Sequence, residues 1–182
     1  MKPRKCKSCG ACFERQRAMQ SVCSPMCAAD LARAKKEQAE RKQARAKREQ
    51  LKTRSDWIKE AQVAVNKFVR LRDAGRGCIS CGCSLSDGGT GGGADAGHYR
   101  SRGSSPHLRF EVNNIHAQCK RCNRYLAGNA IEFRAGLVVR YGSEYVEALE
   151  ADQEPRMYGI PELRTIRDTY RALARELEKA NA

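Results

Sequence analysis

Apolar side chains recur at helical spacing in two segments of the chain, one in the middle and one at the end. The first segment predicts an amphipathic helix with an N-cap at Ser55 that ends before Gly75. The second follows Pro161, which suits a first helical turn, and predicts a helix that packs on the core or pairs with another chain. The apolar positions are Trp57, Ile58, Ala61, Val65, Phe68 and Val69, and then Leu163, Ile166, Tyr170, Leu173 and Leu177.

The stretch 28–52 has a different pattern, with strong helix formers, no proline or glycine, and no apolar stripe. Such a sequence predicts a solvated helix that spaces two modules apart. Between the two apolar helices, the pattern predicts a strand pair around His98 and residues 110–115, followed by a helix that opens at a Cys-x-x-Cys motif. The glycine-rich stretch 88–93 predicts a flexible loop.

Positive charge is concentrated near the N-terminus. The chain has 35 lysines and arginines against 21 acidic residues, and residues 1–55 hold 16 of the former and five of the latter. A basic run serves solubility alone in many proteins, but this excess favours a polyanionic partner, with nucleic acid first. A membrane surface would need an apolar face, and Leu51 is the only large apolar residue between Arg33 and Arg54. With no apolar run long enough for a signal peptide or a membrane span, we expect a cytoplasmic protein.

Ten cysteines in a reducing compartment indicate metal ligation rather than disulfides. Two Cys-x-x-Cys turns, about forty residues apart, bring four thiolates to one tetrahedral zinc ion while the chain between them forms a loop or hairpin. We expect these ligands to be Cys78, Cys81, Cys119 and Cys122. Cys83 is expected to be a free thiol in the turn.

A second four-thiolate set lies near the N-terminus, where Cys6 and Cys9 precede Cys23 and Cys27. The spacing also allows Cys9 to pair with Cys12, but we prefer Cys6 with Cys9, because Cys12 then simply precedes a packing aromatic residue. A zinc knuckle of this size has little other core, so the metal is expected to hold its fold.

Residues suited to hydrolytic chemistry lie between the two core motifs and just after them. Asp95 and His98 belong to the predicted hairpin, Asn114 to the connecting segment, and Asn123 to the helix that follows. A neutral imidazole deprotonates water near neutral pH, and a hard cation stabilises charge on a phosphate. These side chains therefore supply a general base, an orienting group and a metal ligand for phosphodiester hydrolysis.

Several segments carry a specific resemblance, in order along nearly the whole chain. They are CSPMC at 23–27, WIKEAQVAVNKFVRLRD at 57–73, DAGHYR at 95–100, RFEVNNIHAQCKRCN at 109–123 and GN at 128–129. Together they resemble the NinG (Rap) recombination proteins of lambda-like bacteriophages. The core resembles an HNH endonuclease of the ββα-metal class that is tied by a four-cysteine zinc.

We therefore expect an α+β fold in four parts. These are an N-terminal zinc knuckle at 1–29, a basic helical linker at 30–54, an HNH-like nuclease core with its zinc at 55–140, and a C-terminal helical region at 141–182. The resemblance implies cleavage of branched DNA, including Holliday junctions and D-loops, during phage recombination in the bacterial host. It also implies a catalytic Mg²⁺ or Mn²⁺ ion beside the two structural zinc ions.

By this resemblance, His98 is the general base, Asn114 orients the hairpin, and Asn123 takes the helix position that is often a metal-binding histidine. Most HNH enzymes place an aspartate ligand directly before the base, where this chain has Gly97. Asp95, two residues earlier on the same side of an extended strand, is expected to reach the cation with Asn123.

The remaining expectations concern the surroundings of the site and its partners. His116 contacts phosphate or orients a zinc-binding turn, and His107 is unspecialised. A homodimer through the stripe from Leu163 to Leu177 would supply the two active sites that symmetric cleavage of a junction needs, and phage recombination proteins are further partners. The alternative function is a zinc-dependent DNA-binding or recombination adaptor protein without catalysis. The basic residues suited to DNA contacts are Arg100, Arg102, Arg109, Lys120, Arg121 and Arg124.

Overall fold

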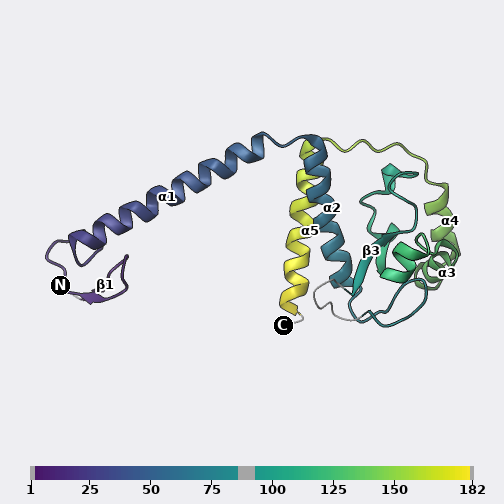
Figure 1. Ribbon diagram of the computed structural model, residues 1–182, viewed down its shortest axis with the longest axis horizontal. Helices are drawn as coiled ribbons and strands as arrows, with labels where there is room; N and C mark the ends of the chain where they lie inside the picture. Colours follow the sequence, from purple (N-terminus) through teal and green to yellow (C-terminus); the bar gives the residue numbers. More distant parts are fainter. Residues whose placement is uncertain (1–2, 86–92, 181–182) are drawn as a thin grey trace. The chain divides into compact units, whose positions relative to one another are not determined.

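The computed structural model describes residues 3–85 and 93–180 and divides into two compact units, Met1–Lys52 and Thr53–Ala182 (Figure 1). The core module and the C-terminal region expected from the sequence belong to the same unit. Apart from Gly93, the glycine-rich segment expected to be a flexible loop lies outside the described residues.

The first unit consists of a small hairpin and one long helix. Strands β1 (Arg4–Lys5) and β2 (Cys12–Phe13) pair antiparallel, and α1 (Pro25–Gln50) follows. The helix begins before residue 28 because the Ser24 hydroxyl accepts a hydrogen bond from the backbone N–H of Cys27 at 3.2 Å, with Pro25 in the first turn. All of α1 is described and none of its residues is buried, which confirms the expected solvated helix.

Helices α2 (Arg54–Arg72) and α5 (Ile160–Ala180) lie side by side in the second unit and enclose its larger core (Figure 1). Both helices expected from the apolar spacing are confirmed. Leu163, Ile166 and Tyr170 of the C-terminal stripe pack in this core, so this part of the stripe is covered within the same chain, while the homodimer stays a prediction. The buried members of the core are Trp57, Ala61, Val65, Val69, Phe110, Ile115 and Leu163.

The N-cap of α2 is Thr53, so the assignment to Ser55 is wrong. The Thr53 hydroxyl accepts from the backbone N–H of Asp56, and the Asp56 carboxylate accepts from the backbone N–H of Thr53 at 3.0 Å. This reciprocal pair satisfies two helix-terminal donors, which a lone cap at Ser55 would not do. No helix within the described ranges is long and apolar enough to cross a membrane.

Strands β3 (Ala94–His98) and β4 (Ile115–Cys119) form an antiparallel hairpin that carries the candidate chemistry. Asp95 pairs with Gln118 and Gly97 with His116. The strand expected at 110–115 begins only at its last residue, because Val112–Asn114 form a 3₁₀ turn that the Glu111 side chain caps. The apolar side chains before β4 enter the α2 and α5 core from this turn.

The motif after β4 opens a single π-helical turn, Arg121–Tyr125, and not the expected regular helix. Ala127, Gly128 and Asn129 then adopt left-handed backbone angles, with φ of 49°, 88° and 45°, which interrupt any helix. Helices α3 (Ala130–Tyr141) and α4 (Ser143–Ala151) follow. They enclose a second core made of Ile79, Phe133, Leu137 and Val146.

Candidate active site and metal centres

Four cysteines of the first unit converge on one point. The sulfurs of Cys6, Cys9, Cys23 and Cys27 all lie within 4.8 Å of one another. Cys23 Sγ is 3.7 Å from the sulfur of Cys9 and 3.5 Å from that of Cys27. A tetrahedral zinc ion with Zn–S bonds of about 2.3 Å needs sulfurs about 3.8 Å apart, so these thiols fit zinc. The preference for Cys6 over Cys12 is confirmed by the geometry.

The core cluster includes a thiol that sequence reasoning left outside the ligand set. The sulfurs of Cys78, Cys81, Cys83 and Cys119 lie within 4.8 Å of one another, and those of Cys81 and Cys119 are 3.8 Å apart. Cys83, which was expected to be a free thiol in the turn, lies within this group because a tight turn returns it to the other cysteines. The backbone N–H of Cys78 donates to the Cys83 carbonyl at 2.8 Å, and Gly82 permits the turn with a φ of 71°.

Cys122, the expected fourth ligand, is buried beside this group. Its backbone N–H points at Cys119 Sγ at 3.4 Å, and its own sulfur accepts from Asn129 Nδ2 at 3.6 Å. Burial, together with the neighbouring thiols of Cys81 and Cys119, raises the pKa of Cys122 to about 12. Five thiols therefore gather where a tetrahedral ion needs four, and Cys78, Cys81 and Cys119 are common to both sets of four.

His98, at the end of β3, has one ring nitrogen committed to the backbone. Its Nε2 lies 3.1 Å from the carbonyl oxygen of Arg109, and because a carbonyl only accepts, Nε2 carries the proton. Nδ1 is then the unprotonated nitrogen, and it has no hydrogen-bond partner among the described residues. Burial lowers the pKa of His98 to about 4, and the charges of Arg102 and Arg109 contribute. The imidazole is therefore neutral at physiological pH, as a general base requires.

Asn114 is fully buried and binds the loop that joins the two strands. Its Oδ1 accepts from the backbone N–H of Arg100 at 2.8 Å. Its Nδ2 donates to the carbonyls of Arg100 and Leu108, at 3.0 Å and 3.1 Å. The loop leads directly to Arg109, whose carbonyl holds His98, so Asn114 orients the connection behind the imidazole.

Asp95 and Asn123 meet beside β3. Asn123 Nδ2 donates to Asp95 Oδ2 at 2.9 Å, and the Arg124 guanidinium donates to both oxygens of the same carboxylate, at 2.6 Å and 2.8 Å. The bonds from Arg124 lower the pKa of Asp95 and outweigh its partial burial, so the carboxylate is ionised at neutral pH. The structure thus brings together the two side chains expected at the cation, with the carboxylate held in an ion pair.

These residues line an open cavity of about 390 Å³. Its wall carries three arginines, Arg70, Arg102 and Arg124, against the single carboxylate of Asp95, which suits a phosphate group. Sequence reasoning did not identify Asn66, Arg70 or Ser101. The four-residue spacing of Asn66 and Arg70 on one helix face was the only sequence signal for the first two. The lining residues are Asn66, Arg70, Asp95, Ala96, His98, Ser101, Arg102, Asn123, Arg124, Ala127 and Gly128.

The other basic residues expected at DNA are not among the described lining residues of this cavity. Arg109 lines a second cavity, of about 480 Å³, beside Phe110 and Tyr158. Burial lowers the pKa of Arg109, with a contribution from the charge of Arg102. Of the rest, Arg121 is exposed, whereas Arg100 and Lys120 are half-buried.

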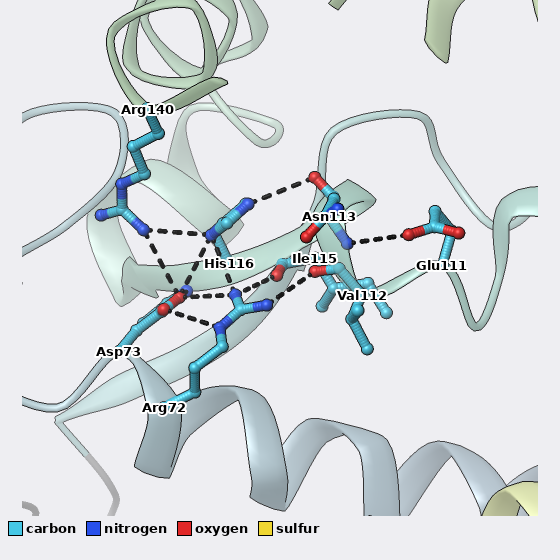
Figure 2. A network of polar contacts seen from close by, with 9 residues as sticks. Arg72, Asp73, Glu111, Val112, Asn113, Ile115, His116 and Arg140 are labelled. Atoms are coloured by element: carbon cyan, nitrogen blue, oxygen red, sulfur yellow. Dashed lines mark hydrogen bonds and ion pairs between the residues drawn. The ribbon is translucent and has the colours of Figure 1, made fainter. Parts of the chain in front are cut away.

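His116 belongs to a buried polar network and not to the cavity (Figure 2). Its Nε2 lies 3.2 Å from the carbonyl of Asn113 and donates to it. Its Nδ1 lies 2.9 Å from the guanidinium of Arg72, 3.1 Å from that of Arg140 and 3.2 Å from the Asp73 carboxylate. Burial lowers the pKa of His116, which keeps the ring neutral. Of the two roles left open for this residue, the structure therefore excludes direct access to a phosphate.

Asp73 is the anion of this network. Arg72 donates to both of its oxygens, at 2.9 Å and 3.0 Å, and the backbone N–H of Ala117 donates at 3.0 Å. Burial alone would raise the pKa of Asp73, but the close contact with His116 and the bonds from Arg72 and Ala117 hold it well below its usual range. Arg72 also binds the carbonyls of Val112 and Ile115, so the network joins the end of α2 to β4 (Figure 2).

His107 was expected to be unspecialised, but it is buried. Its Nε2 lies 2.8 Å from the carbonyl of Asp152, and its own carbonyl accepts from the Tyr158 hydroxyl at 2.8 Å. The residue therefore ties the strand-connecting loop to the segment after α4, which is a structural task.

The chain is similar to known phage proteins over its whole length. A family model described as bacteriophage Lambda NinG protein matches residues 1–181. NinG of Escherichia phage lambda is 38% identical over 199 residues, which covers 98% of this chain and 95% of that protein. NinG of Salmonella phage P22 is 37% identical, with coverage of 98% and 96%. NinG of Escherichia phage 933W is 40% identical over 132 residues, covering 72% of this chain and 63% of that relative. No solved structure matches the chain. The chain therefore belongs to the NinG protein family.

Proposed function

We propose that this NinG family protein is a phage endonuclease that hydrolyses phosphodiester bonds in branched DNA, such as Holliday junctions and D-loops, with a divalent cation. The observation that carries the proposal is the state of His98. A neutral imidazole lines a basic cavity, with Nε2 bound to a carbonyl and Nδ1 left to accept a proton. His107 makes a similar carbonyl bond in a structural role, and what distinguishes His98 is that it lines a cavity together with Asp95 and Asn123.

In the proposed reaction, His98 Nδ1 takes a proton from a water molecule in the cavity. The water oxygen forms a bond to phosphorus, and the bond from phosphorus to the leaving sugar oxygen breaks. The Arg109 carbonyl fixes the imidazole tautomer and stabilises the imidazolium that forms, because Nε2–H keeps donating to it. Asn114 acts through the backbone, by holding the loop that positions this carbonyl.

The residues beside His98 fit a hard divalent cation. The Asp95 carboxylate and the Asn123 side-chain oxygen would hold Mg²⁺ or Mn²⁺, which prefer oxygen ligands. When bound, the cation stabilises charge on the phosphate and the leaving oxygen. The arginines Arg70, Arg102 and Arg124 bind and orient the backbone phosphates that flank the cleaved bond.

The first unit supplies affinity for DNA in this proposal. Helix α1 buries no residue, and its basic side chains are exposed along its length. Exposed basic side chains bind DNA phosphates irrespective of sequence, and the affinity of such binding falls steeply as the salt concentration rises. Binding thus depends mainly on the first unit and cleavage on the second, in the cytoplasm of the host and with phage recombination proteins as partners.

A nicking assay tests the proposal. The zinc-loaded protein is incubated with a supercoiled plasmid that extrudes a cruciform and with a synthetic four-way junction, in buffers with and without Mg²⁺. We expect Mg²⁺-dependent cleavage of the branched DNA, and His98→Ala should slow it about 10²- to 10⁴-fold, the usual contribution of a general base. Gel-shift affinity for the junction should stay at the parent value.

Glu176→Ala, on the exposed face of α5, is the control variant and should cleave at the parent rate. Zinc content and thermal unfolding establish that both variants are folded. Equal cleavage by the parent and His98→Ala would refute the assignment of the base. Tight binding of junctions with no cleavage by the parent under any metal would instead support the zinc-dependent DNA-binding or adaptor function.

A further inference from the structure

We propose that the side-chain carbonyl of Gln118 is an oxygen ligand of the divalent cation, in place of the carboxylate that Gly97 does not provide. The inference rests on the proposed function for the presence of a cation beside Asp95 and Asn123. It adds a residue of the neighbouring strand that no resemblance assigned to the site.

The hydrogen bonds of Gln118 determine which way its amide points. Nε2 donates to the Ser80 hydroxyl at 2.7 Å and to the carbonyl of Gly128 at 2.7 Å. A carbonyl oxygen only accepts, so the nitrogen must face Gly128 and the two amide atoms cannot be exchanged. Oε1 therefore points away from these partners, toward β3.

Gln118 Oε1 is a buried acceptor without a donor among the described residues. The whole residue has no exposed surface, and no N–H or O–H of the residues that the structure describes makes a hydrogen bond to this oxygen. Such an atom is unfavourable in a folded protein unless an unseen partner satisfies it. A metal ion is one such partner, because amide carbonyls are ligands of Mg²⁺ and Mn²⁺.

Gln118 Oε1 occupies the space that a side chain at position 97 would fill. A Cβ atom built on Gly97 would lie 2.0 Å from Gln118 Oε1 and 3.2 Å from Asn123 Oδ1. The two side-chain oxygens are therefore at most about 5 Å apart. Ligands of one cation with bonds of about 2.1 Å are roughly 3–4 Å apart, so the proposal requires that Asn123 and Gln118 reach that separation when the cation binds. An aspartate at position 97 could not enter this space while Gln118 fills it.

The strand register places the remaining ligand on the same side. Asp95 is directly opposite Gln118 in the hairpin, and directly opposite residues share a face of the sheet. Asn123, which donates to Asp95 at 2.9 Å, approaches this face from the π-helical turn. Three oxygen-bearing side chains, from β3, β4 and the turn after β4, thus converge beside Gly97.

Binding of Mn²⁺ tests this inference independently of cleavage. The zinc-loaded full-length protein is titrated with Mn²⁺, and free ion is measured by its electron paramagnetic resonance signal. We expect Gln118→Ala to weaken Mn²⁺ binding about tenfold or more, as Asp95→Asn should. Gln118→Met, which retains the length of the side chain without its oxygen, should have the same effect and serves if the alanine variant does not fold.

Gln62→Ala is the matched control. Gln62 is also buried, with an Oε1 that has no partner among the described residues and one Nε2 bond, to Asn66. Its replacement should leave the Mn²⁺ affinity unchanged. Zinc content and thermal unfolding show whether each variant is folded.

A rescue experiment distinguishes a ligand role of Gln118 from a purely structural role. Gly97→Asp alone should bind Mn²⁺ weakly, because its side chain collides with Gln118. Combined with Gln118→Ala, which opens the space, the same aspartate should restore Mn²⁺ affinity to within about threefold of the parent. A structural role of Gln118 predicts no such rescue.

A folded Gln118→Ala or Gln118→Met variant that binds Mn²⁺ as tightly as the parent would overturn the inference, and so would a parent that binds no Mn²⁺. DNA cleavage is assayed in parallel. If the parent cleaves while Gln118→Ala retains full Mn²⁺ affinity, the ligand role fails and the nuclease stands. If Mn²⁺ binding follows the expected pattern but the parent cleaves no DNA, the nuclease fails and the ligand role stands.

Discussion

Replacing Asp73 with asparagine should lower the free energy of unfolding of the second unit by about 3 kcal/mol. Asp73 has no exposed surface and is the single carboxylate within hydrogen-bond distance of Arg72 in the described structure. It also lies 3.7 Å from Arg140. Asparagine preserves the side-chain volume and an acceptor for the backbone N–H of Ala117. The change removes the charge and the oxygen that accepts from Arg72 Nε.

The magnitude follows from the exposure of the partners. Removing one member of a buried ion pair costs about 3–5 kcal/mol, because the other charge is left without compensation. The side chains of Arg72 and Arg140 are both 18% exposed, so water offsets part of the loss and the lower end of the range applies. For a unit of this size, 3 kcal/mol corresponds to a fall in Tm of roughly 10–15 °C.

The assay is thermal and urea unfolding of the zinc-loaded protein at pH 7, followed by circular dichroism. Asp168→Asn is the matched control, because its carboxylate pairs with Arg167 but is 56% exposed, and its loss should cost less than about 1 kcal/mol. The pKa of Asp73 is lowered in the folded state, so its stabilisation is complete above its usual value of 3.8 and declines as the pH falls below it. The difference between the parent and Asp73→Asn should therefore shrink toward pH 3. A loss at pH 7 no larger than that of Asp168→Asn would refute the reasoning.

Three further predictions concern the cavity and the basic helix. Because burial lowers the pKa of His98 to about 4, cleavage should fall off only as the pH drops toward that value, and an acid limb near 6.5 in the pH profile would contradict the assignment. Arg124→Ala should release Asp95 from its ion pair and therefore raise the Mn²⁺ affinity measured by electron paramagnetic resonance. It should also reduce the slope of log K for DNA binding against log salt concentration by about one. Glutamine at four exposed positions of α1 should reduce that slope by up to about 3, with no change in the cleavage rate at saturating DNA, as measured by fluorescence anisotropy and nicking. The four positions are Arg41, Lys42, Arg45 and Arg48.

The helices and the cysteine cluster of the first unit could be predicted because their signals are local. Apolar spacing alone located the middle and terminal helices, and the paired cysteine motifs located the four thiols of the first unit. The cap of α2 was misplaced because Ser55 and Thr53 are both common N-caps, and only the reciprocal bond with Asp56 decides between them. The proximity of Cys83 to the core cluster was not predicted, because it depends on the backbone turn at Gly82, which residue spacing does not specify.

The rest of the site depends on long-range register. Gln118 and Asp95 are 23 positions apart in the chain, and only the pairing of β3 with β4 brings them together. His116 could be assigned to a role only once Arg72 and Arg140, from α2 and α3, were seen to enclose it. Asn66 and Arg70 lie on α2, whose apolar residues already account for its packing in the core. The polar residues of this helix therefore gave no sequence signal that they line a cavity.

The hairpin that carries the candidate chemistry is anchored at both ends of β4 by different means. At the start of β4, Arg72 donates to the carbonyl of Ile115 and Asp73 accepts from the backbone N–H of Ala117. These buried charged side chains therefore fix the part of β4 that pairs with His98. At its end, Cys119 enters the thiol cluster, and the following turn presents Asn123 to Asp95. The proposed general base and the proposed cation ligands are therefore positioned by separate supports, the buried ion pairs at one end of β4 and the thiol cluster at the other. In the proposed nuclease, this division lets the β3–β4 hairpin hold both halves of a hydrolytic site in register.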